Sequence, residues 1–370
     1  MRPADAGERA RLGALFAELC AIPSPSGSEA AVSARVREEL EGLGLEVEAD
    51  EAGNLLVPIA GADPGARTVL LCTHLDTVGH TGPIRPVLHE DTWVNGEPDA
   101  ILGADNKAAV AHVLLVARRA VAEPPPVGIE LLFTVGEEEA LRGAKAFDVR
   151  RLRADRGYVF DHATPLGEVV LASPTYHRVE AEFLGRAAHA GIRPEDGRSA
   201  VLAAARALAE MRLGRLDAET TANAGMITGG SGANVVPEHC HVTLEARSLD
   251  EARVEETVAG IVDHLQDGAN AEEVDLDVAV ECLFRGYRTA PDAPEVRAAE
   301  AALRARGHAP SHIVTGGGSD ANALRSAGLP CVNLANGTER NHQPDERVSV
   351  AALAGALDVT LALVAECART

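Results

Sequence analysis

The sequence predicts an α/β protein with a mixed, largely parallel sheet, into which a smaller α+β domain is inserted. The first 170 residues alternate helical and strand-like patterns, which is typical of an α/β sheet. Beyond Thr175 the strand-like segments alternate apolar and polar residues, and after Gly286 the first pattern returns. A chain of 370 residues also exceeds the usual size of one hydrophobic core. We therefore expect a discontinuous first domain, 1–174 and 288–370, and an inserted domain, 175–287.

In the first domain, helices are expected where apolar residues recur with helical spacing, and strands where short apolar runs occur. The buried helix that starts at Lys107 is stopped by Pro124-Pro125-Pro126, because proline lacks the N–H that a helix interior requires. The predicted helices are 5–20, 29–42, 107–122, 294–306 and 350–366, and the predicted strands are 45–49, 54–59, 68–73, 129–134, 158–161 and 329–333.

In the inserted domain, the alternating segments predict a β-β-α-β-β-α-like order. Such an order fits one open sheet with helices on a single face. The predicted strands are 176–183, 224–227, 240–247 and 274–280, and the predicted helices are 199–211 and 250–266.

Composition excludes several classes of partner. The formal net charge of −22 argues against nucleic acid or an anionic membrane surface. No apolar run approaches the roughly 20 residues that span a bilayer, and the first residues form an amphipathic pattern without a signal-peptide core. The six cysteines are widely spaced without a CxxC, so we expect buried thiols in a reducing cytoplasm.

Short acidic or histidine motifs are the features that carry chemistry, and most of them directly follow a predicted strand. That is where an α/β sheet places its functional loops. The motifs are His74-Leu75-Asp76-Thr77, Gly103-Ala104-Asp105-Asn106-Lys107, Gly136-Glu137-Glu138-Glu139, Phe160-Asp161-His162 and Asn341-His342-Gln343-Pro344-Asp345-Glu346.

His74 and Asp76 stand two residues apart at the end of a predicted strand. Because strand side chains alternate in direction, both lie on the same face. His74 can then bind a metal through one ring nitrogen, while Asp76 accepts the proton of the other and fixes the tautomer. A His-x-Asp pair by itself is also common for purely structural reasons.

The carboxylates have structural interpretations as well. Asp105 precedes a helix, where an Asp is most often an N-cap. Glu137 and Glu138 belong to an acidic run of the kind that is usually solvated, yet adjacent carboxylates at a sheet edge repel unless a cation lies between them. Asp161 ends a strand and is followed by His162, so either residue is a candidate ligand.

The motifs are informative in combination. Taken singly, His342 is a histidine in a polar loop. Two histidines with three or four carboxylates, however, supply three protein ligands for each of two metal ions, with one carboxylate shared. A further glutamate beside them serves as the base toward the attacking water. The combination predicts metal-dependent hydrolysis.

On these residues, the chain resembles the M20 family of metallopeptidases, and within it the peptidase T-like tripeptidase branch. The resemblance extends over essentially the whole chain. Its most specific segments are His-Leu-Asp-Thr-Val (74–78), Gly-Ala-Asp-Asn-Lys (103–107), Gly-Glu-Glu (136–138), Ala-Ala-His-Ala-Gly (187–191), Asn-Val-Val-Pro (234–237), Glu-Ala-Arg-Ser (245–248), Gly-Gly-Gly-Ser-Asp-Ala-Asn (316–322) and His-x-x-Asp-Glu (342–346).

The resemblance implies a zinc-exopeptidase catalytic domain and a ferredoxin-like lid or dimerisation domain. It implies that His74, Asp105 and Asp161 hold one zinc ion, and that Asp105, Glu138 and His342 hold the second. Co²⁺ and Mn²⁺ are the alternative metals. The family's peptide bond after the shared aspartate is typically cis.

For the base, the resemblance implies Glu137, with Asp76 as the residue that orients His74. Glu139 leaves a second register open, in which Glu138 is the base and Glu139 the ligand. The spacing to the following Gly-Ala favours the first register.

Beyond the metal centre, the resemblance implies that His189 stabilises the oxyanion across a dimer interface. It also implies that Asn234 and Arg247 contact the substrate, Arg247 by pairing with a carboxylate, although Arg247 fits a structural ion pair equally well. Gly317 and Gly318 suit close backbone approach to a ligand, or simply a tight turn.

The sequence thus predicts a cytoplasmic, homodimeric, two-zinc exopeptidase that removes the N-terminal residue from small peptides. The alternative is an amidohydrolase or carboxypeptidase of the same superfamily that acts on N-acyl amino acids or peptide C-termini. A catalytically inactive binding module is less favoured, because every ligand and the base are present.

Overall fold

The computed structural model describes residues 1–80 and 82–369, which divide into two compact units. The large unit comprises residues 1–172 and the chain from residue 289 onward, and the inserted unit is Ser173–Arg288. Each unit has a hydrophobic core of its own. The α/β class with a mixed sheet is confirmed.

The main sheet of the large unit has four parallel strands at its centre, in the order β6 (Gly128–Thr134), β3 (Thr68–His74), β7 (Gly157–His162) and β16 (Cys331–Ala335). Because these strands point in one direction, their carboxyl ends meet at the same edge of the sheet. The sheet is extended by the antiparallel strands β2 (Leu55–Ile59), β1 (Glu48–Ala49) and β8 (Glu168–Ser173), and by β15 (Ser311–Val314), which is parallel to β8.

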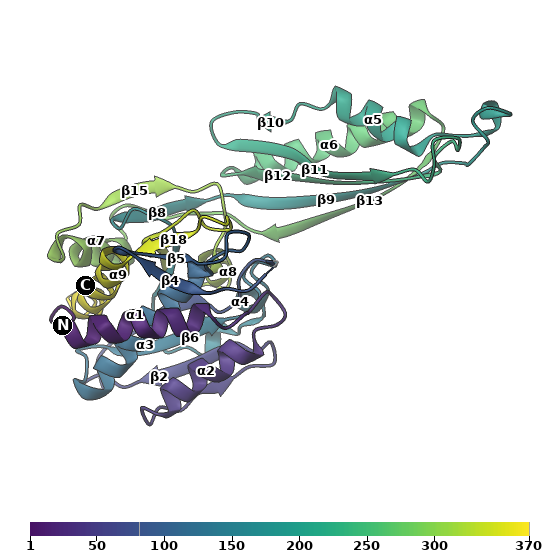
Figure 1. Ribbon diagram of the computed structural model, residues 1–370. Helices are drawn as coiled ribbons and strands as arrows, with labels where there is room; N and C mark the ends of the chain where they lie inside the picture. The colour runs from purple at the N-terminus through teal and green to yellow at the C-terminus, as the bar shows by residue number, and fades with distance from the viewer. Residues whose placement is uncertain (81, 370) are drawn as a thin grey trace. The chain divides into compact units, whose positions relative to one another are not determined.

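Helices cover both faces of this sheet (Figure 1). Alternate strand residues such as Leu71 belong to the core that includes the long helices, whereas the neighbouring Cys72 faces the start of α8. One face is covered by α1 (Ala6–Cys20), α2 (Ala30–Glu41), α3 (Ala104–Ala122), α7 (Pro294–Ala305) and α9 (Val350–Glu366), and the other by α4 (Arg142–Ala146) and α8 (Asp320–Ser326). A short 3-10 helix, η1 (Val149–Arg151), follows α4.

A small second sheet in the large unit positions the loop that carries His342. Its antiparallel strands run in the order β17 (Thr338–Glu339), β18 (Arg347–Ser349), β5 (Thr92–Asn95) and β4 (Pro86–His89). Since β17 and β18 pair directly, the intervening loop 340–346 begins and ends at fixed points.

The inserted unit is one antiparallel sheet with two helices on a single face (Figure 1). Along β9, the residues Val179, Ala181 and Phe183 are buried under these helices, while Glu180 and Glu182 point to the open face. The sheet order is β10 (Gly214–Arg215), β11 (Thr220–Gly229), β12 (His239–Ser248), β9 (Thr175–Leu184) and β13 (Asp275–Phe284). The remaining elements of the unit are α5 (Ala200–Glu210), α6 (Glu251–Ala271), the 3-10 helix η2 (Pro194–Asp196) and β14 (Tyr287–Arg288).

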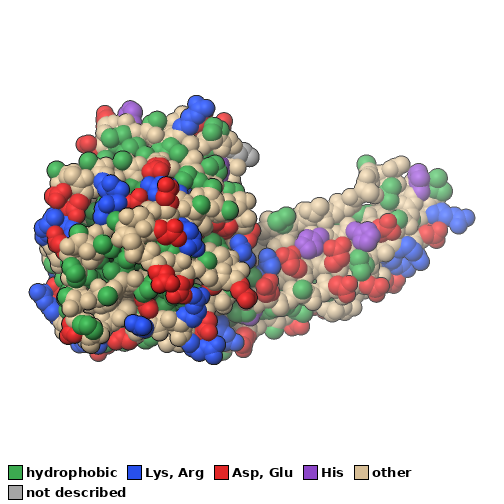
Figure 2. Space-filling model, turned by 90° about the horizontal axis from the view of Figure 1, so that it is seen from below, with side chains coloured by type: hydrophobic (Ala, Val, Ile, Leu, Met, Phe, Trp, Pro, Cys, Tyr) green, Lys and Arg blue, Asp and Glu red, His purple; other side chains and the backbone are tan. Residues whose placement is uncertain are grey.

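The surface reflects the composition. On the face shown in Figure 2, Asp and Glu side chains are spread over both units, and Lys and Arg lie between them rather than in one basic patch. Among the described residues, no helix is long and apolar enough to cross a membrane. Five cysteines are buried free thiols as expected, but Cys282 is exposed, because it lies on the outer part of β13.

Short elements account for most differences from the sequence-based expectations. In the inserted unit the order is β9, α5, β10, β11, β12, α6 and β13, so the predicted β-β-α-β-β-α order is wrong: the first helix follows a single strand, and a strand follows the last helix. The strand β11 is longer than the predicted 224–227, and α6 extends beyond residue 266. Elements of two to seven residues bury too little of a periodic pattern to be recognised from sequence. Those not predicted are β4, β5, β8, β10, β14, β15, β17, β18, α4 and α8.

Candidate functional site

The predicted metal ligands of the large unit converge at the carboxyl edge of the parallel strands. His74 is the last residue of β3, and Asp161 lies near the end of β7. Glu138 follows β6 after a short turn, and His342 lies in the loop between β17 and β18. Asp105 is in the first turn of α3, next to these strands. Five positions that are far apart in the sequence therefore share one edge of the sheet.

His74 is buried and is held by Asp76. Its Nδ1 lies 3.1 Å from the Asp76 carbonyl oxygen and 3.3 Å from Asp76 Oδ1. Its Nε2 lies 3.3 Å from Asp105 Oδ1 and 3.3 Å from Asp161 Oδ1. With the Nδ1 proton donated to Asp76, the lone pair of Nε2 is directed at the two other carboxylates.

Asp105 does not act as a helix cap. Its Oδ2 accepts from the Asn341 side chain, its Oδ1 has no hydrogen-bond partner among the described residues, and neither oxygen binds an N–H of the helix start. The peptide bond between Asp105 and Asn106 is cis. The Asn106 side chain donates to the carbonyl oxygen of Phe160, at 2.7 Å, and so joins this turn to the strand that carries Asp161.

His342 completes a second cluster with Asp105 and Glu138. Its Nε2 lies 2.9 Å from Glu138 Oε1 and 3.2 Å from Asp105 Oδ2. The neighbouring Asn341 also donates to Asp105 Oδ2, at 2.9 Å. The two oxygens of Asp105 thus face different histidines, since Oδ1 faces His74 and Oδ2 faces His342.

Several of the ligand-type atoms are buried without a hydrogen-bond partner among the described residues. These atoms are His74 Nε2, Asp105 Oδ1 and Glu138 Oε1. They also form one of two groups whose ligand atoms lie within 4.8 Å of one another; the other group joins His74, Glu137 and Asp161. Buried polar atoms without partners are costly, and imidazole and carboxylate donors suit zinc and its divalent neighbours. The residues present therefore fit metal ions.

The electrostatics of the site favour cations. Burial lowers the pKa of His74, but Asp161 and Asp105 outweigh it, so that the pKa lies well above its ordinary value. Hydrogen bonds to Asp105 and Glu138 raise the pKa of His342 to about 10. Burial raises the pKa of Asp161 to about 7, against the effect of His74. Positive charge among these carboxylates is thus strongly stabilised.

The three consecutive glutamates have different environments. Glu137 is buried, and burial together with Asp161 raises its pKa well above the usual range. Glu138 faces His342, whereas the Glu139 side chain is 56% exposed and lies 3.3 Å from Arg142. The backbone N–H groups of Glu137 and Glu138 both donate to Asp76, at 2.9 and 3.1 Å. Asp76 therefore contacts both His74 and this turn, an additional contact that the sequence did not indicate.

Asp320 is a further buried carboxylate near the site that sequence analysis did not single out. Its Oδ2 accepts from the Thr134 hydroxyl at 2.5 Å, and its Oδ1 is buried without a partner among the described residues. Burial raises its pKa to about 6. Asp320 lies in the segment Gly316–Asn322, of which only the glycines are candidate site residues in the sequence. The position of an Asp directly after Gly-Gly-Gly-Ser is the sequence feature that could have indicated it.

In that same segment, Gly317 and Gly318 are half-buried in the loop before α8. A Cβ added at Gly317 would meet only Thr315 Oγ1, at 3.8 Å, so the structure leaves open space beside this glycine.

His162 is the alternative ligand beside Asp161. Its Nε2 lies 2.8 Å from Glu168, so this nitrogen is already paired.

In the inserted unit, the structure brings His189 and Asn234 together. The loop of His189 forms a bridge with Val235, and the N–H of Ala190 donates to the Asn234 carbonyl oxygen at 2.9 Å. Arg247 lies elsewhere, near the opposite end of β12, eight residues beyond His239 and so roughly 26 Å away. Its guanidinium stacks 4.1 Å from the centre of the Tyr176 ring and pairs with Glu245 at 3.0 Å.

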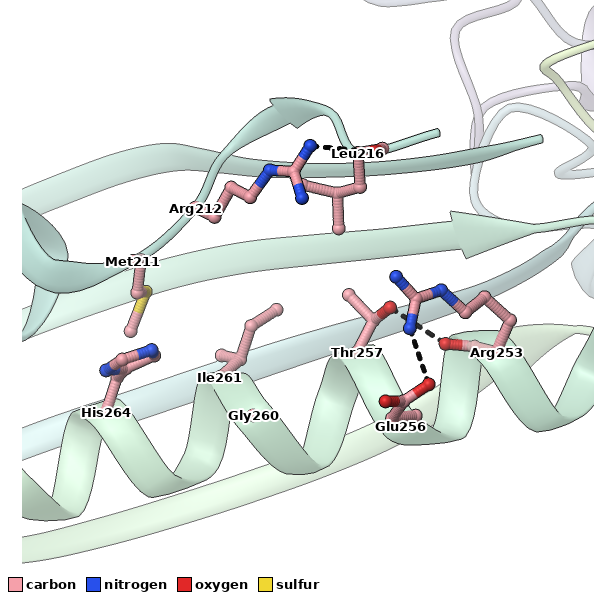
Figure 3. Close-up of a pocket in the computed structure, with 9 residues that line it drawn as sticks. All are labelled: Met211, Arg212, Leu216, Arg253, Glu256, Thr257, Gly260, Ile261 and His264. Atoms are coloured by element: carbon pink, nitrogen blue, oxygen red, sulfur yellow. Dashed lines mark hydrogen bonds and ion pairs between the residues drawn. The ribbon is translucent and has the colours of Figure 1, made fainter. Parts of the chain in front are cut away.

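A hollow of about 190 Å³ on the inserted unit is lined by two arginines, Arg212 and Arg253 (Figure 3). Both arginines already have partners within the unit, which leaves them poorly suited to bind an anion. Arg253 is paired with Asp217 and Glu256, at 3.2 and 2.5 Å. Arg212 donates to the Leu216 carbonyl oxygen at 3.0 Å. Because these charges are satisfied within the unit, the hollow is not a second candidate site.

Two family models match the chain. The peptidase dimerisation domain of the M20 type matches residues 172–273, which is nearly the whole inserted unit. Peptidase family M28 matches residues 54–167, a range that contains the candidate ligands except His342.

Several related proteins match the chain over nearly its full length. The chain is 36% identical to the aminopeptidase PepT from Bacillus cereus, with 97% of this chain and 99% of that chain covered and a TM-score of 0.86. It is 32% identical to a tripeptidase from Staphylococcus aureus, with 98% and 99% covered and a TM-score of 0.91. The uncharacterized protein YqjE of Bacillus subtilis is 34% identical over 364 residues, 96% of this chain and 97% of the relative. The chain belongs to the M20 family of metallopeptidases and, within it, to the peptidase T-like branch.

Proposed function

We propose that the protein is a two-metal aminopeptidase that removes the N-terminal residue from small peptides, tripeptides above all. The observation that carries this proposal is the convergence of unpartnered, buried imidazole and carboxylate atoms at one sheet edge. The choice of an aminopeptidase is supported by the names of the full-length relatives, an aminopeptidase and a tripeptidase.

In this proposal His74, Asp105 and Asp161 hold one ion, and Asp105, Glu138 and His342 hold the other. Support comes from the two oxygens of Asp105, which face different histidines. Zinc suits the mixed imidazole and carboxylate donors, with Co²⁺ and Mn²⁺ as alternatives. When bound, the ions would polarise the scissile carbonyl and lower the pKa of a water molecule.

Glu137 is the proposed general base. Its buried carboxylate lies beside His74 and Asp161, and burial makes it a stronger proton acceptor than an exposed glutamate. It would take a proton from the attacking water and deliver it to the leaving amine. The exposure of Glu139 and its pairing with Arg142 favour this register over the one in which Glu138 is the base.

Asp76 is the proposed positioning residue for this base and for the first ion. It accepts hydrogen bonds from the backbone of Glu137 and Glu138 and from the Ser26 hydroxyl, and it contacts His74. One carboxylate therefore restrains both the imidazole ligand and the turn that carries the base.

We also propose that the protein is a homodimer through the inserted unit. His189 and Arg247, both proposed to contact the reacting peptide, lie near opposite ends of one sheet. One copy of the unit cannot present both to a single dipeptide- or tripeptide-sized substrate, whereas two copies can. Beyond Ala222, no described strand pairs with the outer edge of β11, and Met226 and Ile227 there are 61% and 52% exposed.

The test is hydrolysis of a mixed panel by the purified protein with added Zn²⁺ or Co²⁺, followed by mass spectrometry. The panel contains di- and tripeptides with free or acetylated N-termini, and N-acyl amino acids. Release of the first residue from free-amine peptides only is the expected result. Cleavage of the blocked substrates instead would identify the alternative, an amidohydrolase or carboxypeptidase, and would overturn the aminopeptidase proposal.

A further inference from the structure

Glu346 ends the loop that carries His342, and its side chain is bound to the turn that carries Asp105. Its Oε1 accepts from the backbone N–H of Asp105 at 2.8 Å, and its Oε2 accepts from that of Gly103 at 2.7 Å. The two segments are more than 240 residues apart in the sequence. The same carboxylate therefore joins the two segments that supply two of the three proposed ligands of the second metal ion, Asp105 and His342.

The Glu346 carboxylate is buried without an ion-pair partner among the described residues. Glu346 is 1% exposed and forms no ion pair with any described residue, whereas the adjacent Asp345 is exposed and pairs with Arg340 at 2.9 Å. Burying a carboxylate without a cation is unfavourable unless hydrogen bonds satisfy its oxygens. Both Glu346 oxygens accept hydrogen bonds from backbone N–H groups of the 103–105 turn. These bonds offset the unfavourable burial of the carboxylate only while the turn keeps its conformation.

The backbone on both sides of this contact has unusual conformations. Gly103 has φ +72°, and His342 has φ +65°, a region that non-glycine residues seldom adopt. A turn bond from the Glu346 N–H to the Gln343 carbonyl oxygen, at 3.0 Å, closes the loop between His342 and Glu346. His342 itself is 46% exposed, so few packing contacts are available to hold its ring. The pairing of β17 with β18 fixes the ends of its loop, and the Asn341 side chain and Glu346 both bind the Asp105 turn. Of these contacts, only Glu346 binds the backbone of that turn through both of its carboxylate oxygens.

We infer that Glu346 is a positioning residue for the second metal ion. By holding the backbone of Asp105 against the loop of His342, it keeps these two ligands near the observed 3.2 Å separation before an ion binds. The first ion should depend less on this contact, because two of its three proposed ligands, His74 and Asp161, are carried by the parallel strands β3 and β7, and only the shared Asp105 contacts Glu346. The inference rests on the proposed two-metal function.

The test is a titration of the metal-free full-length protein with Co²⁺, followed by visible absorbance, with the bound metal counted by elemental analysis. The variants are Glu346→Gln and, as a matched control, Asp345→Asn. Asp345→Asn should bind two ions, each with the same affinity as the corresponding ion in wild type. Glu346→Gln should bind the first ion within about threefold of wild type and the second about 10- to 100-fold more weakly, as expected when a group that orients a ligand is removed.

A double variant separates a role through His342 from a general effect. If Glu346 acts by placing this ligand, Glu346→Gln combined with His342→Ala should bind the one remaining Co²⁺ ion within about threefold of His342→Ala alone. Weaker binding of that remaining ion in the double variant would show an effect that does not pass through His342 and would overturn the inference. Equal binding of both ions by Glu346→Gln and wild type would overturn it as well, with the proposed function intact.

The metal-free state supplies the remaining outcomes. Near-wild-type circular dichroism and melting temperature of metal-free Glu346→Gln are expected, and loss of the native fold would assign a structural role and overturn the inference. If wild type itself binds fewer than two ions, the two-metal function fails together with this inference. That result is distinguishable because it appears without any substitution.

Discussion

At the scale of single residues, the site separates chemically identical side chains by their surroundings. Glu137 is buried beside His74, Glu138 faces His342, and Glu139 is exposed to solvent beside Arg142. Three adjacent carboxylates of the same intrinsic acidity thereby have different environments, and these environments are the basis for the different roles proposed for them, because burial and neighbouring charge decide how each binds a proton or a cation.

Replacing Glu137 by Gln should leave both metal ions bound and reduce kcat at least about 100-fold, the usual contribution of a general base. Metal content and steady-state kinetics with a tripeptide measure the two effects. Glu139→Gln is the matched control and should retain kcat within about twofold. A large loss in Glu139→Gln with normal rates in Glu137→Gln would show that the register is shifted.

Replacing His342 by Ala should reduce the metal content from two ions to one, because Glu138 and Asp105 alone bind an ion weakly. Elemental analysis after dialysis measures the stoichiometry. His162→Ala is the control, since His162 is already paired with Glu168. Two ions in His342→Ala, or one in His162→Ala, would contradict the ligand assignment.

At the scale of elements, the turn after β6 is held from several sides. The Asn54 side chain accepts from the Val135 N–H at 3.1 Å and donates to the Gly143 carbonyl oxygen at 2.9 Å. Glu29 accepts from the Gly136 N–H at 3.0 Å. These contacts, together with Asp76, restrain a segment that would otherwise be an exposed acidic loop.

Gly143→Ala should disrupt this turn. An added Cβ would lie against the Val135 carbonyl oxygen and Asn54 Oδ1, within the bonds that hold the turn. We expect a loss of stability of about 1–3 kcal/mol and a lower kcat, because overpacking displaces the backbone of Glu137. Thermal unfolding and kinetics measure both. Gly260→Ala, where nothing lies within 4 Å of the added Cβ, should be neutral or slightly stabilising.

The packing of α3 against α9 predicts a pH dependence of stability. His112 is buried on α3, with its Nδ1 3.4 Å from the Thr360 hydroxyl, and burial lowers its pKa from 6.5 to about 3. Between these pH values only the unfolded chain takes up the proton. The free energy of unfolding should therefore fall as the pH is lowered from 6.5 to about 3, by up to about 1.4 kcal/mol per pH unit from this group.

Chemical denaturation of the metal-free protein at several pH values checks this prediction. His112→Leu lacks the titrating group, so its stability should fall less steeply than that of wild type over the same range. The exposed His89→Gln should follow wild type. Parallel curves for wild type and His112→Leu would rule out the effect.

At the scale of the whole molecule, the proposed dimer depends on an open edge of the inserted sheet. Ile227→Asp places a charge on the outer edge of β11 and should convert the dimer into a monomer, as measured by light scattering. Val280→Asp, at a site that is 46% exposed on the strand at the other edge of the sheet, is the matched control and should remain dimeric. Because His189 is proposed to act across the interface, the monomer should also lose turnover. A monomer with full activity would exclude that role.

Long periodic segments account for what could be predicted of the fold. Helices α1, α3 and α9 and strands β3, β6 and β12 bury enough of a regular pattern to be recognised without tertiary information. The metal-ligand candidates could be found for a related reason: they follow those strands, and parallel strands bring their ends together. Short strands such as β17 and β18, by contrast, form only through hydrogen bonds to their partner strands. Their own residues are too few to show a recognisable strand pattern.

The sequence by itself determined the α/β class, the insertion and the set of candidate ligands, because hydrophobic periodicity and the order of strands are local properties of the chain. Only the tertiary structure decided how that set is arranged. It placed both oxygens of Asp105 toward different histidines, buried Glu346 against the turn of Asp105, and separated Arg247 from His189 along one sheet. These outcomes depend on strand register and on hydrogen bonds between segments hundreds of residues apart, and local patterns carry no information about either.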